Sequence, residues 1–216
     1  VTVSSTRYTY AYLFDSPSSP SSIAAGSGTS ATFTVKLANS GPYYLRVSFY
    51  DSSAMGSFTA KVEDMGTDDY SDTASGAGAL SVGPSGVTGN VQFPGDVDWL
   101  TFDATAGRIY KVTVSSTSSG YAYLYDSPSA TNLISSGTGT LATFTVKLAN
   151  TGPYYLRVDF YSSAMGSFTA KVEDLGTDDH SDSATSATSV PVGTSTTPTA
   201  GSIQFPGDED WFTFNA

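Results

Sequence analysis

The sequence predicts an all-β fold of tandem, jelly-roll-like β-sandwich domains, and three observations support this fold class. Ser and Thr supply 64 of the 216 residues, whereas Ala, Leu, Lys and Glu are too few for long helices. Short segments alternate apolar and polar residues between turn residues. Long stretches of the sequence also occur twice. Because 39% of the residues are hydrophobic, with 14 Tyr and 12 Phe, the chain can form packed cores, which argues against wholesale disorder.

The alternating segments predict half-buried antiparallel strands. They are expected at 33–37, 44–47, 58–62, 99–102 and 109–114. Gly, Pro, Asp or Ser bounds each segment, and no helical period of ten residues interrupts them. Such regular spacing is typical of a sandwich or jelly roll with about eight strands per unit.

An internal repeat organises the chain. Val1 recurs as Val112, and most of the sequence that follows is repeated in the same order, with few substitutions. The matched segments are 1–6 with 112–117, 10–17 with 121–128, 33–39 with 144–150, 41–47 with 152–158, 55–64 with 165–174, and 92–99 with 204–211. A unit of about 110 residues is long enough to own a hydrophobic core, unlike a solenoid repeat.

Residues 105–111 are the one part of the repeat that occurs once. Their counterpart would follow Ala216 and precede Val1. The sequence therefore predicts that the chain starts and stops inside a repeat. Either it belongs to a longer tandem array, or neighbouring chains complete each other's domains.

Several motifs, in their order along the chain, resemble the bacterial pre-peptidase C-terminal domain. These motifs are DDYSDTA at 68–74, GNV at 89–91, GDVDWLTF at 95–102, AGRIY at 106–110, YLYD at 123–126 and PYYLRV at 153–158. That family is a β-sandwich found beside secreted proteases and in surface proteins, and its relatives include the collagen-binding modules of clostridial collagenases. The resemblance implies that 68–174 is a complete domain, 1–64 the second half of a preceding one, and 178–216 the first half of a following one.

The charge of the chain is strongly acidic and clustered. The chain has twenty acidic and nine basic residues, which gives a net charge of -11 and argues against a nucleic-acid ligand. Fifteen acids fall in the segments 63–72, 96–98, 173–182 and 208–210. Two carboxylates 6 Å apart repel by about 3 kcal/mol at an effective dielectric constant near 20, so a cation is expected between them. Calcium suits short Asp side chains in irregular loops better than magnesium or zinc does.

The resemblance indicates which residues would bind Ca²⁺. In related modules the acidic stretch at the domain start and the Gly-Asp-x-Asp loop converge on calcium. Carried over to this chain, the two sets are Asp68, Asp69, Asp72, Asp96 and Asp98, and Asp178, Asp179, Asp182, Asp208 and Asp210. The alternative left open is that Asp serves only as a turn residue that caps backbone amides.

No catalytic residues are predicted. The only His is His180, and Tyr70 takes its place in the other repeat, so Ser–His chemistry could not operate in both units. Gly-x-Ser-x-Gly is absent, the Gly-rich loops lack a Walker Lys, and Cys is absent. Paired Asp residues could hydrolyse a glycosidic bond, but each pair recurs with its loop, which favours a structural role. No apolar run approaches the roughly 20 residues of a membrane helix.

A stripe of aromatic residues is the remaining candidate for a binding surface. Tyr10 and Tyr12 lie on one face of an expected strand, and Tyr121 and Tyr123 repeat them. An exposed stripe could stack on sugars or hold a collagen-like rod. The intervening residues are also apolar, so the alternation does not show which face of the strand is exposed to solvent. Core or interdomain packing is the favoured interpretation.

The sequence predicts a structural tandem-repeat protein of an extracellular bacterial fibre, stalk or adhesin shaft. Calcium at the joints between domains would make it rigid, and its partners would be other copies of itself. The alternative is a collagen- or polysaccharide-binding accessory module of a secreted hydrolase. Both functions place the protein outside the cell or on its surface.

Overall fold

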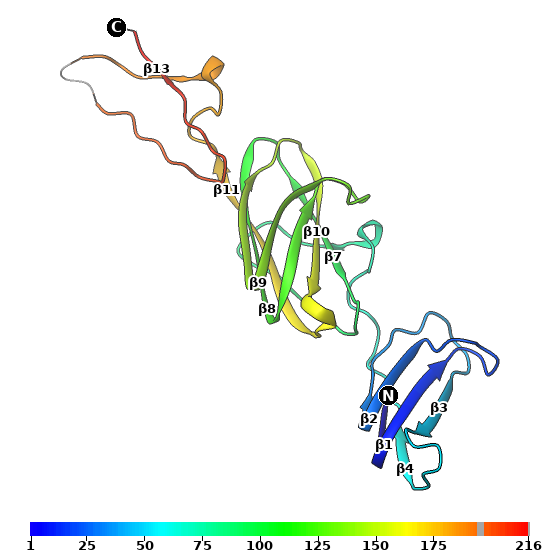
Figure 1. Cartoon of the computed structure of the whole chain (residues 1–216). Helices are drawn as coiled ribbons and strands as arrows, with labels where there is room; N and C mark the ends of the chain where they lie inside the picture. The colour runs from blue at the N-terminus through cyan, green and yellow to red at the C-terminus, as the bar shows by residue number, and fades with distance from the viewer. Residues whose placement is uncertain (194–196, 216) are drawn as a thin grey trace. The chain divides into compact units, whose positions relative to one another are not determined.

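Strands dominate the computed structural model, which describes residues 1–193 and 197–215 (Figure 1). Contacts divide the chain into one unit of Val1–Thr67 and another of Asp68–Ala216, and each is described by itself. The helices of the described residues are three single turns, η1 (Ala74–Gly76), η2 (Tyr161–Ser163) and η3 (Ala184–Ser186). None has the length or the apolar character needed to span a bilayer. The predicted all-β class is confirmed.

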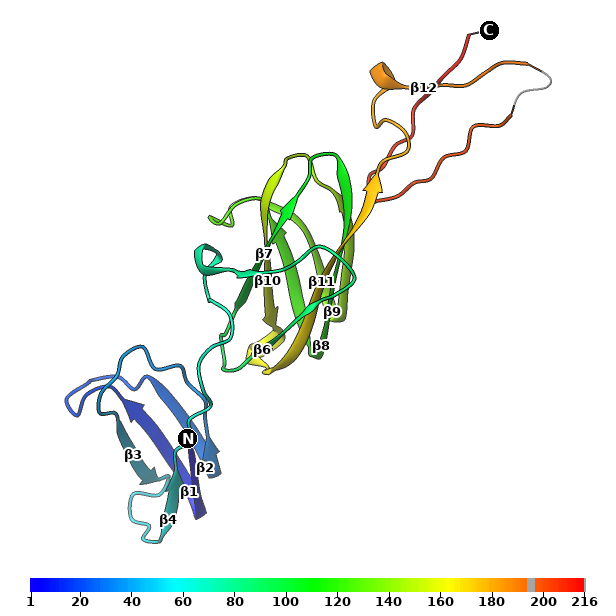
Figure 2. The ribbon, with the colours of Figure 1, turned by 180° about the vertical axis from the view of Figure 1, so that it is seen from behind.

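The second unit contains a seven-stranded sheet (Figures 1 and 2). Its strands are β5 (Gly78–Ala79), β6 (Val87–Val91), β7 (Asp98–Ala104), β8 (Arg108–Tyr125), β9 (Leu133–Lys147), β10 (Gly152–Phe160) and β11 (Gly166–Thr177). The order is β5-β7-β10-β8-β11-β6, and β9 also pairs with β8. All pairs are antiparallel except the parallel pair β5–β7.

The long strand β8 turns this sheet into a sandwich. Residues 108–116 of β8 pair with β11, and residues 120–125 pair with β10. The register with β9 shifts between Ser115 and Gly120, where β8 passes from one layer to the other. One layer therefore carries β6 and β11, the other carries β5, β7 and β10, and β8 and β9 belong to both.

Alternate residues of these strands fill the space between the layers. Leu100, Leu124, Leu156, Val112 and Val158 are fully buried in one continuous cluster. Burying each such side chain stabilises the fold by about 1.5–3 kcal/mol. The predicted strands at 99–102 and 109–114 lie within β7 and β8.

The first unit is a four-stranded sheet of β1 (Thr2–Phe14), β2 (Ala24–Thr32), β3 (Tyr44–Phe49) and β4 (Phe58–Lys61). Its pairings repeat those of β8 to β11 residue by residue. Thr9 pairs with Phe49 as Gly120 pairs with Phe160, and Thr2 pairs with Thr32 as Thr113 pairs with Thr143. The sequence repeat is thus also a repeat of hydrogen-bonded register.

The strand predicted at 33–37 is wrong for the first unit, where β2 ends at Thr32. In the second unit the matching residues of β9 pair with residues 109–112 of β8. Val1 is the one residue of this chain that corresponds to that stretch of β8. It exchanges two bonds with Phe33, because its ammonium donates to Phe33 O (2.9 Å) and its carbonyl accepts from Phe33 N–H (3.1 Å).

The last part of the second unit repeats its first part. The short strands β12 (Thr188–Ser189) and β13 (Phe212–Thr213) are parallel, and Thr188 pairs with Phe212 as Gly78 pairs with Leu100. Their two-stranded sheet therefore copies the β5–β7 contact.

Candidate metal centre

The loop between β6 and β7 positions two of the predicted aspartates. The chain reverses at Gly95, whose φ of 87° is accessible mainly to glycine. Asp96 N–H donates to Phe93 O (3.1 Å) within this turn, and Asp96 Oδ2 accepts from Gln92 N–H (2.5 Å). Asp98 is the first residue of β7 and is completely buried. The Gly-Asp-x-Asp motif thereby turns two carboxyl groups inward.

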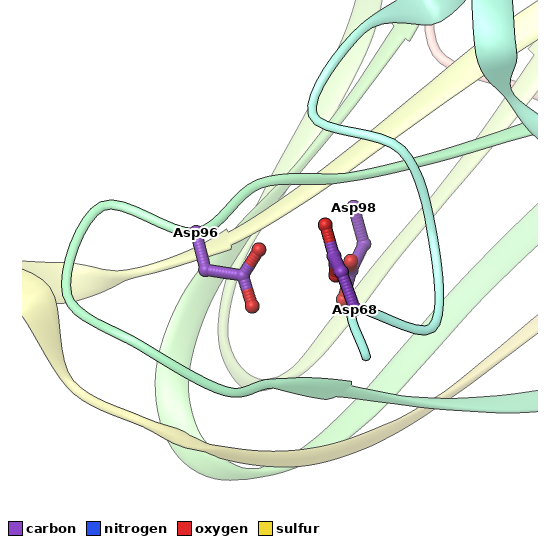
Figure 3. A group of neighbouring side chains, drawn as sticks. All are labelled: Asp68, Asp96 and Asp98. Carbon is purple, nitrogen blue, oxygen red and sulfur yellow. The ribbon is translucent and has the colours of Figure 1, made fainter. Parts of the chain in front are cut away.

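The acidic stretch that opens the unit supplies a third carboxyl group. Trp99 N–H donates to Ser71 O (3.2 Å), which ties this stretch to β7. One carboxylate oxygen each of Asp68, Asp96 and Asp98 lies within 4.8 Å of the other two. Figure 3 shows the three side chains converging, with the Asp96 carboxylate directed toward Asp98 and Asp68. Such an oxygen-only set is the type of ligand that Ca²⁺ prefers.

Several oxygens of Asp96 and Asp98 have no hydrogen-bond donor in the part of the chain that the structure describes. Both carboxylate oxygens of Asp98, and Oδ1 of Asp96, are buried without a hydrogen-bond partner among the described residues. A buried charged oxygen without a partner is costly, and cations or ordered water are its usual partners. The arrangement therefore offers a cation at least three inward-facing oxygens.

Burial and, after it, the negative charges of neighbouring carboxylates, of which Asp96 contributes most, together raise the pKa of Asp98 to about 8. Burial also raises the pKa of Asp96 to about 6, against the hydrogen bond from Gln92 N–H. Both shifts have the same origin: without a cation, the ionised cluster is poorly solvated and repels itself. A divalent ion would reverse both effects.

Asp69 and Asp72, also predicted as ligands, contact backbone amides of the neighbouring segments. Asp69 Oδ2 accepts from Asn90 N–H of β6 (2.8 Å), and Asp72 Oδ1 accepts from Val97 N–H (3.4 Å). These bonds hold the acidic stretch against the strand and the loop that it covers. Asp69 and Asp72 thus accept from backbone amides as turn-capping residues do, whereas Asp96 combines such a bond with a place in the converging cluster.

The second acidic set has similar backbone bonds. Gln204 N–H donates to Asp208 Oδ2 (2.5 Å) and Glu209 N–H donates to Asp182 Oδ1 (3.3 Å), as in the first set. Two groups of three bring carboxylate oxygens within 4.8 Å of one another, and both include Asp178. They are Asp178, Asp182 and Asp208, and Asp178, Asp179 and Asp210.

A lysine approaches this second set, and sequence reasoning missed it. Lys147 Nζ donates to Asp178 Oδ2 (2.6 Å) and to Asp182 Oδ2 (2.5 Å), and it lies 5.5 Å from the centre of the Phe205 ring. The ammonium thus provides positive charge where the sequence predicts calcium. The only feature of the sequence that pointed to such a contact was that the chain has few basic residues, so each of them has many acidic residues to pair with.

The tyrosines of the aromatic stripe lie on the outer faces of the sheets. Ala11 and Leu13, and likewise Ala122 and Leu124, are the buried residues of these strands. The core part of the favoured interpretation is therefore wrong, because the smaller Ala and Leu side chains fill the narrow space between the layers. Interdomain packing of the stripe stays a prediction. Tyr10 and Tyr12 have ring centres 6.0 Å apart, and Tyr121 and Tyr123 stack at 5.6 Å.

His180 has structural partners. Its Nδ1 lies 2.8 Å from Thr188 Oγ1 and its Nε2 lies 2.8 Å from Ala200 O, while its ring packs on Phe212. Tyr70, its counterpart in the other repeat, donates its hydroxyl hydrogen to Thr88 O (3.1 Å). Both side chains tie the acidic stretch to the segment beside it, which supports the structural interpretation.

No family model and no curated protein matches the chain. Solved structures do match. The pre-peptidase C-terminal domain of a collagenase from Bacillus anthracis is 20% identical, with 44% of this chain and 93% of that chain covered and a TM-score of 0.36. PliG, a periplasmic inhibitor of g-type lysozyme, matches from Aeromonas hydrophila at 18% identity, with 44% of this chain and 98% of that chain covered and a TM-score of 0.34. PliG from Salmonella Typhimurium matches at 16% identity, with 45% of this chain and 99% of that chain covered and a TM-score of 0.32.

Proposed function

We propose that this chain is a structural repeat protein of an extracellular bacterial fibre, stalk or adhesin shaft, and that calcium makes its repeats rigid. The observation that carries the proposal is the buried Asp98, whose two carboxylate oxygens lie beside Asp96 and Asp68 and have no hydrogen-bond donor among residues 1–193 and 197–215. Catalysis would need a polar group open to a substrate. Asp98 is instead closed off from solvent, as suits a structural ion.

Calcium fits the chemistry of the cluster better than other common cations. Three short carboxylates, from the acidic stretch, the β6–β7 loop and the first residue of β7, provide hard oxygen ligands at irregular angles, which Ca²⁺ tolerates and Mg²⁺ does not. No His lies in the set, and zinc would prefer nitrogen or sulfur ligands. Extracellular calcium modules bind with dissociation constants of about 0.1–1 mM, so a cluster of this size is matched to the environment outside cells.

The proposed role of the ion is mechanical. Asp68 is the first residue of the second unit, and Asp96 and Asp98 belong to the loop and strand of the sandwich proper. An ion shared by the three would hold the entering chain against the sheet. A force applied along the chain would then have to break metal–oxygen bonds before it could peel this segment away.

Thermal unfolding of the full chain with 2 mM calcium, with magnesium and after metal removal tests the proposal. We expect calcium alone to raise the melting temperature (Tm) of the wild type, and we expect Asp98→Asn to abolish the increase. Asp103→Asn is the matched control, because Asp103 lies on the same strand and is exposed. Equal Tm values with and without calcium would refute the proposed calcium site.

The second candidate function is a collagen- or polysaccharide-binding accessory module of a secreted hydrolase. The outward position of the tyrosine stripe favours it, because Tyr121, Tyr123 and the exposed Tyr161 form a continuous aromatic surface. Retention on insoluble collagen or polysaccharide tests it. Loss of retention in Tyr121→Ala/Tyr123→Ala, but not in Leu141→Ala on β9, would support this function, whereas no retention of the wild type would exclude it for those ligands.

A further inference from the structure

A pocket lies on the second unit beside its tyrosine stripe. It has a volume of about 200 Å³ and is formed by the end of β6, the β6–β7 loop, the end of β10 and the turn that follows β10. Its lining includes Asp96, Arg157, Asp159, Phe160 and Ser163. Pockets for drug-sized ligands measure about 300–1,000 Å³, so this one is matched to a smaller group, such as a single sugar residue.

Two carboxylate groups in this lining each have an oxygen that lacks a donor. Oδ1 of Asp96 and Oδ1 of Asp159 are buried without a hydrogen-bond partner among the described residues. Their other oxygens are bonded, because Asp96 Oδ2 accepts from Gln92 N–H and Asp159 Oδ2 accepts from Arg157 Nη2 (2.5 Å). A buried carboxylate oxygen without a donor is costly, so a ligand that brings hydroxyl hydrogens into the pocket would bind favourably.

The pocket also presents a hydrogen-bond donor and no net positive charge. The Arg157 side chain is one-third exposed, and its guanidinium is paired with the less exposed Asp159. A hydroxyl group both donates and accepts, so two adjacent hydroxyls of one ligand suit an acid and a guanidinium that lie side by side. An anionic ligand would be repelled by Asp96 and by the net charge of -11. The lining therefore favours an uncharged ligand with several hydroxyl groups.

The tyrosine stripe lies next to the pocket on the same face of the sheet. Asp159 pairs with Tyr121, and Arg157 pairs with Tyr123, whose ring centre is 5.6 Å from the guanidinium carbon. Residues directly opposite each other in an antiparallel pair share a face, so the ion pair and the rings are neighbours. Tyr161 extends the stripe, with its ring centre 6.2 Å from that of Tyr121. Such rings offer the apolar C–H face of a sugar a rigid surface.

The turn after β10 has a strained backbone where it borders the pocket. Ser162 and Ser163 have φ angles of 55° and 60°, a region that residues other than glycine seldom adopt, and such residues cluster at ligand-binding sites. The corresponding turn of the first repeat is one residue longer, and Ser48 stands there in place of Asp159. The acid and the short turn are thus particular to the second unit.

We propose that this pocket binds one residue of a neutral polysaccharide, whose neighbouring sugar residues pack on Tyr121 and Tyr161. The inference rests on the second candidate function and selects polysaccharide over collagen. A triple helix of three chains is too wide to enter a pocket of this volume. Adjacent hydroxyl groups, which sugars have and collagen side chains lack, fit the paired Arg157 and Asp159.

Calorimetric titration of the full chain with cellohexaose, mannohexaose and chitohexaose tests the proposal. We expect binding of at least one hexasaccharide, and we expect Asp159→Ser, which restores the residue of the first repeat, to weaken it at least tenfold. Arg46→Ala is the matched control, because Arg46 lies over Tyr12 in the first unit with Ser48 in place of the acid, and this variant should bind like the wild type. Neither variant alters Asp96, which also belongs to the candidate metal centre. No binding of any hexasaccharide, or equal binding by Asp159→Ser, would overturn the inference.

Amide chemical shifts of the wild type locate the bound sugar without any substitution. Shifts caused by the bound hexasaccharide should be concentrated at 91–97 and 157–164 and in the strand that carries Tyr121. Shifts confined to other parts of the chain would overturn the inference.

Retention on insoluble ligands separates this inference from the function on which it rests. Retention on cellulose or chitin that Tyr121→Ala/Tyr123→Ala abolishes and Asp159→Ser leaves unchanged would support the accessory module and refute the pocket. Retention on collagen without binding of any hexasaccharide would likewise refute only the pocket. If the wild type neither binds a hexasaccharide nor is retained on any of these materials, both proposals fail.

Discussion

Lys147 Nζ lies 2.6 Å from Asp178 Oδ2, so that the end of β9 is joined to the first aspartate that follows β11. Asp178 is well buried at this contact, whereas the second partner, Asp182, is more open. The second acidic set thus includes an ammonium group. Both sets also contain buried carboxylate oxygens without a hydrogen-bond partner among the described residues, on Asp98 in the first set and on Asp178 and Asp208 in the second.

Lys147→Gln should create a stronger calcium site in the second set. Removal of the ammonium leaves Asp178, Asp182 and Asp208 with converging oxygens and no internal cation, so we expect the affinity of that site to rise by about tenfold, equivalent to about 1.4 kcal/mol. Calcium titration by calorimetry measures the change. Lys171→Gln is the control, because Lys171 pairs with Glu173 instead. Unchanged binding in Lys147→Gln would show that the ammonium does not compete with calcium.

Asp98→Asn should stabilise the chain when metal is absent. The amide replaces a carboxyl group whose ionised form is buried among other carboxylates, so the substitution removes repulsion and desolvation cost. We expect the metal-free Tm to rise by about 4 °C, equivalent to roughly 1 kcal/mol in a domain of this size. Differential scanning calorimetry after chelation checks it. A lower metal-free Tm than that of the wild type would contradict the electrostatic account of the cluster.

Metal-free stability should fall as the pH rises from about 4 to about 8. In the unfolded chain Asp98 loses its proton near its ordinary pKa of 3.8, whereas in the folded chain it keeps the proton until its raised pKa of about 8. Between these values the folded state binds more protons, so the free energy of unfolding decreases with pH. With excess calcium the ion competes with the proton, and the stabilisation by calcium should grow with pH. Melting curves over this range, with and without calcium, measure both trends.

Leu156→Ala should cost about 2–5 kcal/mol, because it empties a completely buried position between the layers of the sandwich. The matching Leu45→Ala, at a partly buried position, should cost clearly less in a monomeric chain. Urea unfolding of the two variants compares the sites. Equal costs would contradict the difference in burial between the two positions.

Much of the fold could be predicted from the amino-acid sequence. The alternation at 99–102 and 109–114 depends on neighbours two positions apart, and β7 and β8 contain these segments. The alternation at 33–37 looks the same, yet β2 ends at Thr32, and Phe33 bonds to the backbone of Val1 outside the strand. A strand needs a hydrogen-bonding neighbour, and periodicity in one segment does not reveal whether that neighbour exists.

The candidate site, like the fold, could be predicted only in part from the sequence. The Gly-Asp-x-Asp motif predicts a turn with acidic side chains, and Asp96 and Asp98 do lie close to each other. Their burial, which raises the pKa of Asp98, depends on packing of the acidic stretch that begins at Asp68 over the loop. Lys147 reaches Asp178 across 31 positions of sequence, and no local pattern marks such a contact.

Composition, the repeat and the alternation of residues were enough to specify antiparallel strands, their approximate limits and the clustering of negative charge. These features arise from interactions between near neighbours or from comparing the chain with itself. The packing of distant segments determined three further features: which face of the Tyr121–Tyr123 strand is buried, which carboxylates are desolvated, and which carboxylates pair with an ammonium group. Burial and electrostatic partners are properties of the three-dimensional arrangement, so the sequence alone does not define them.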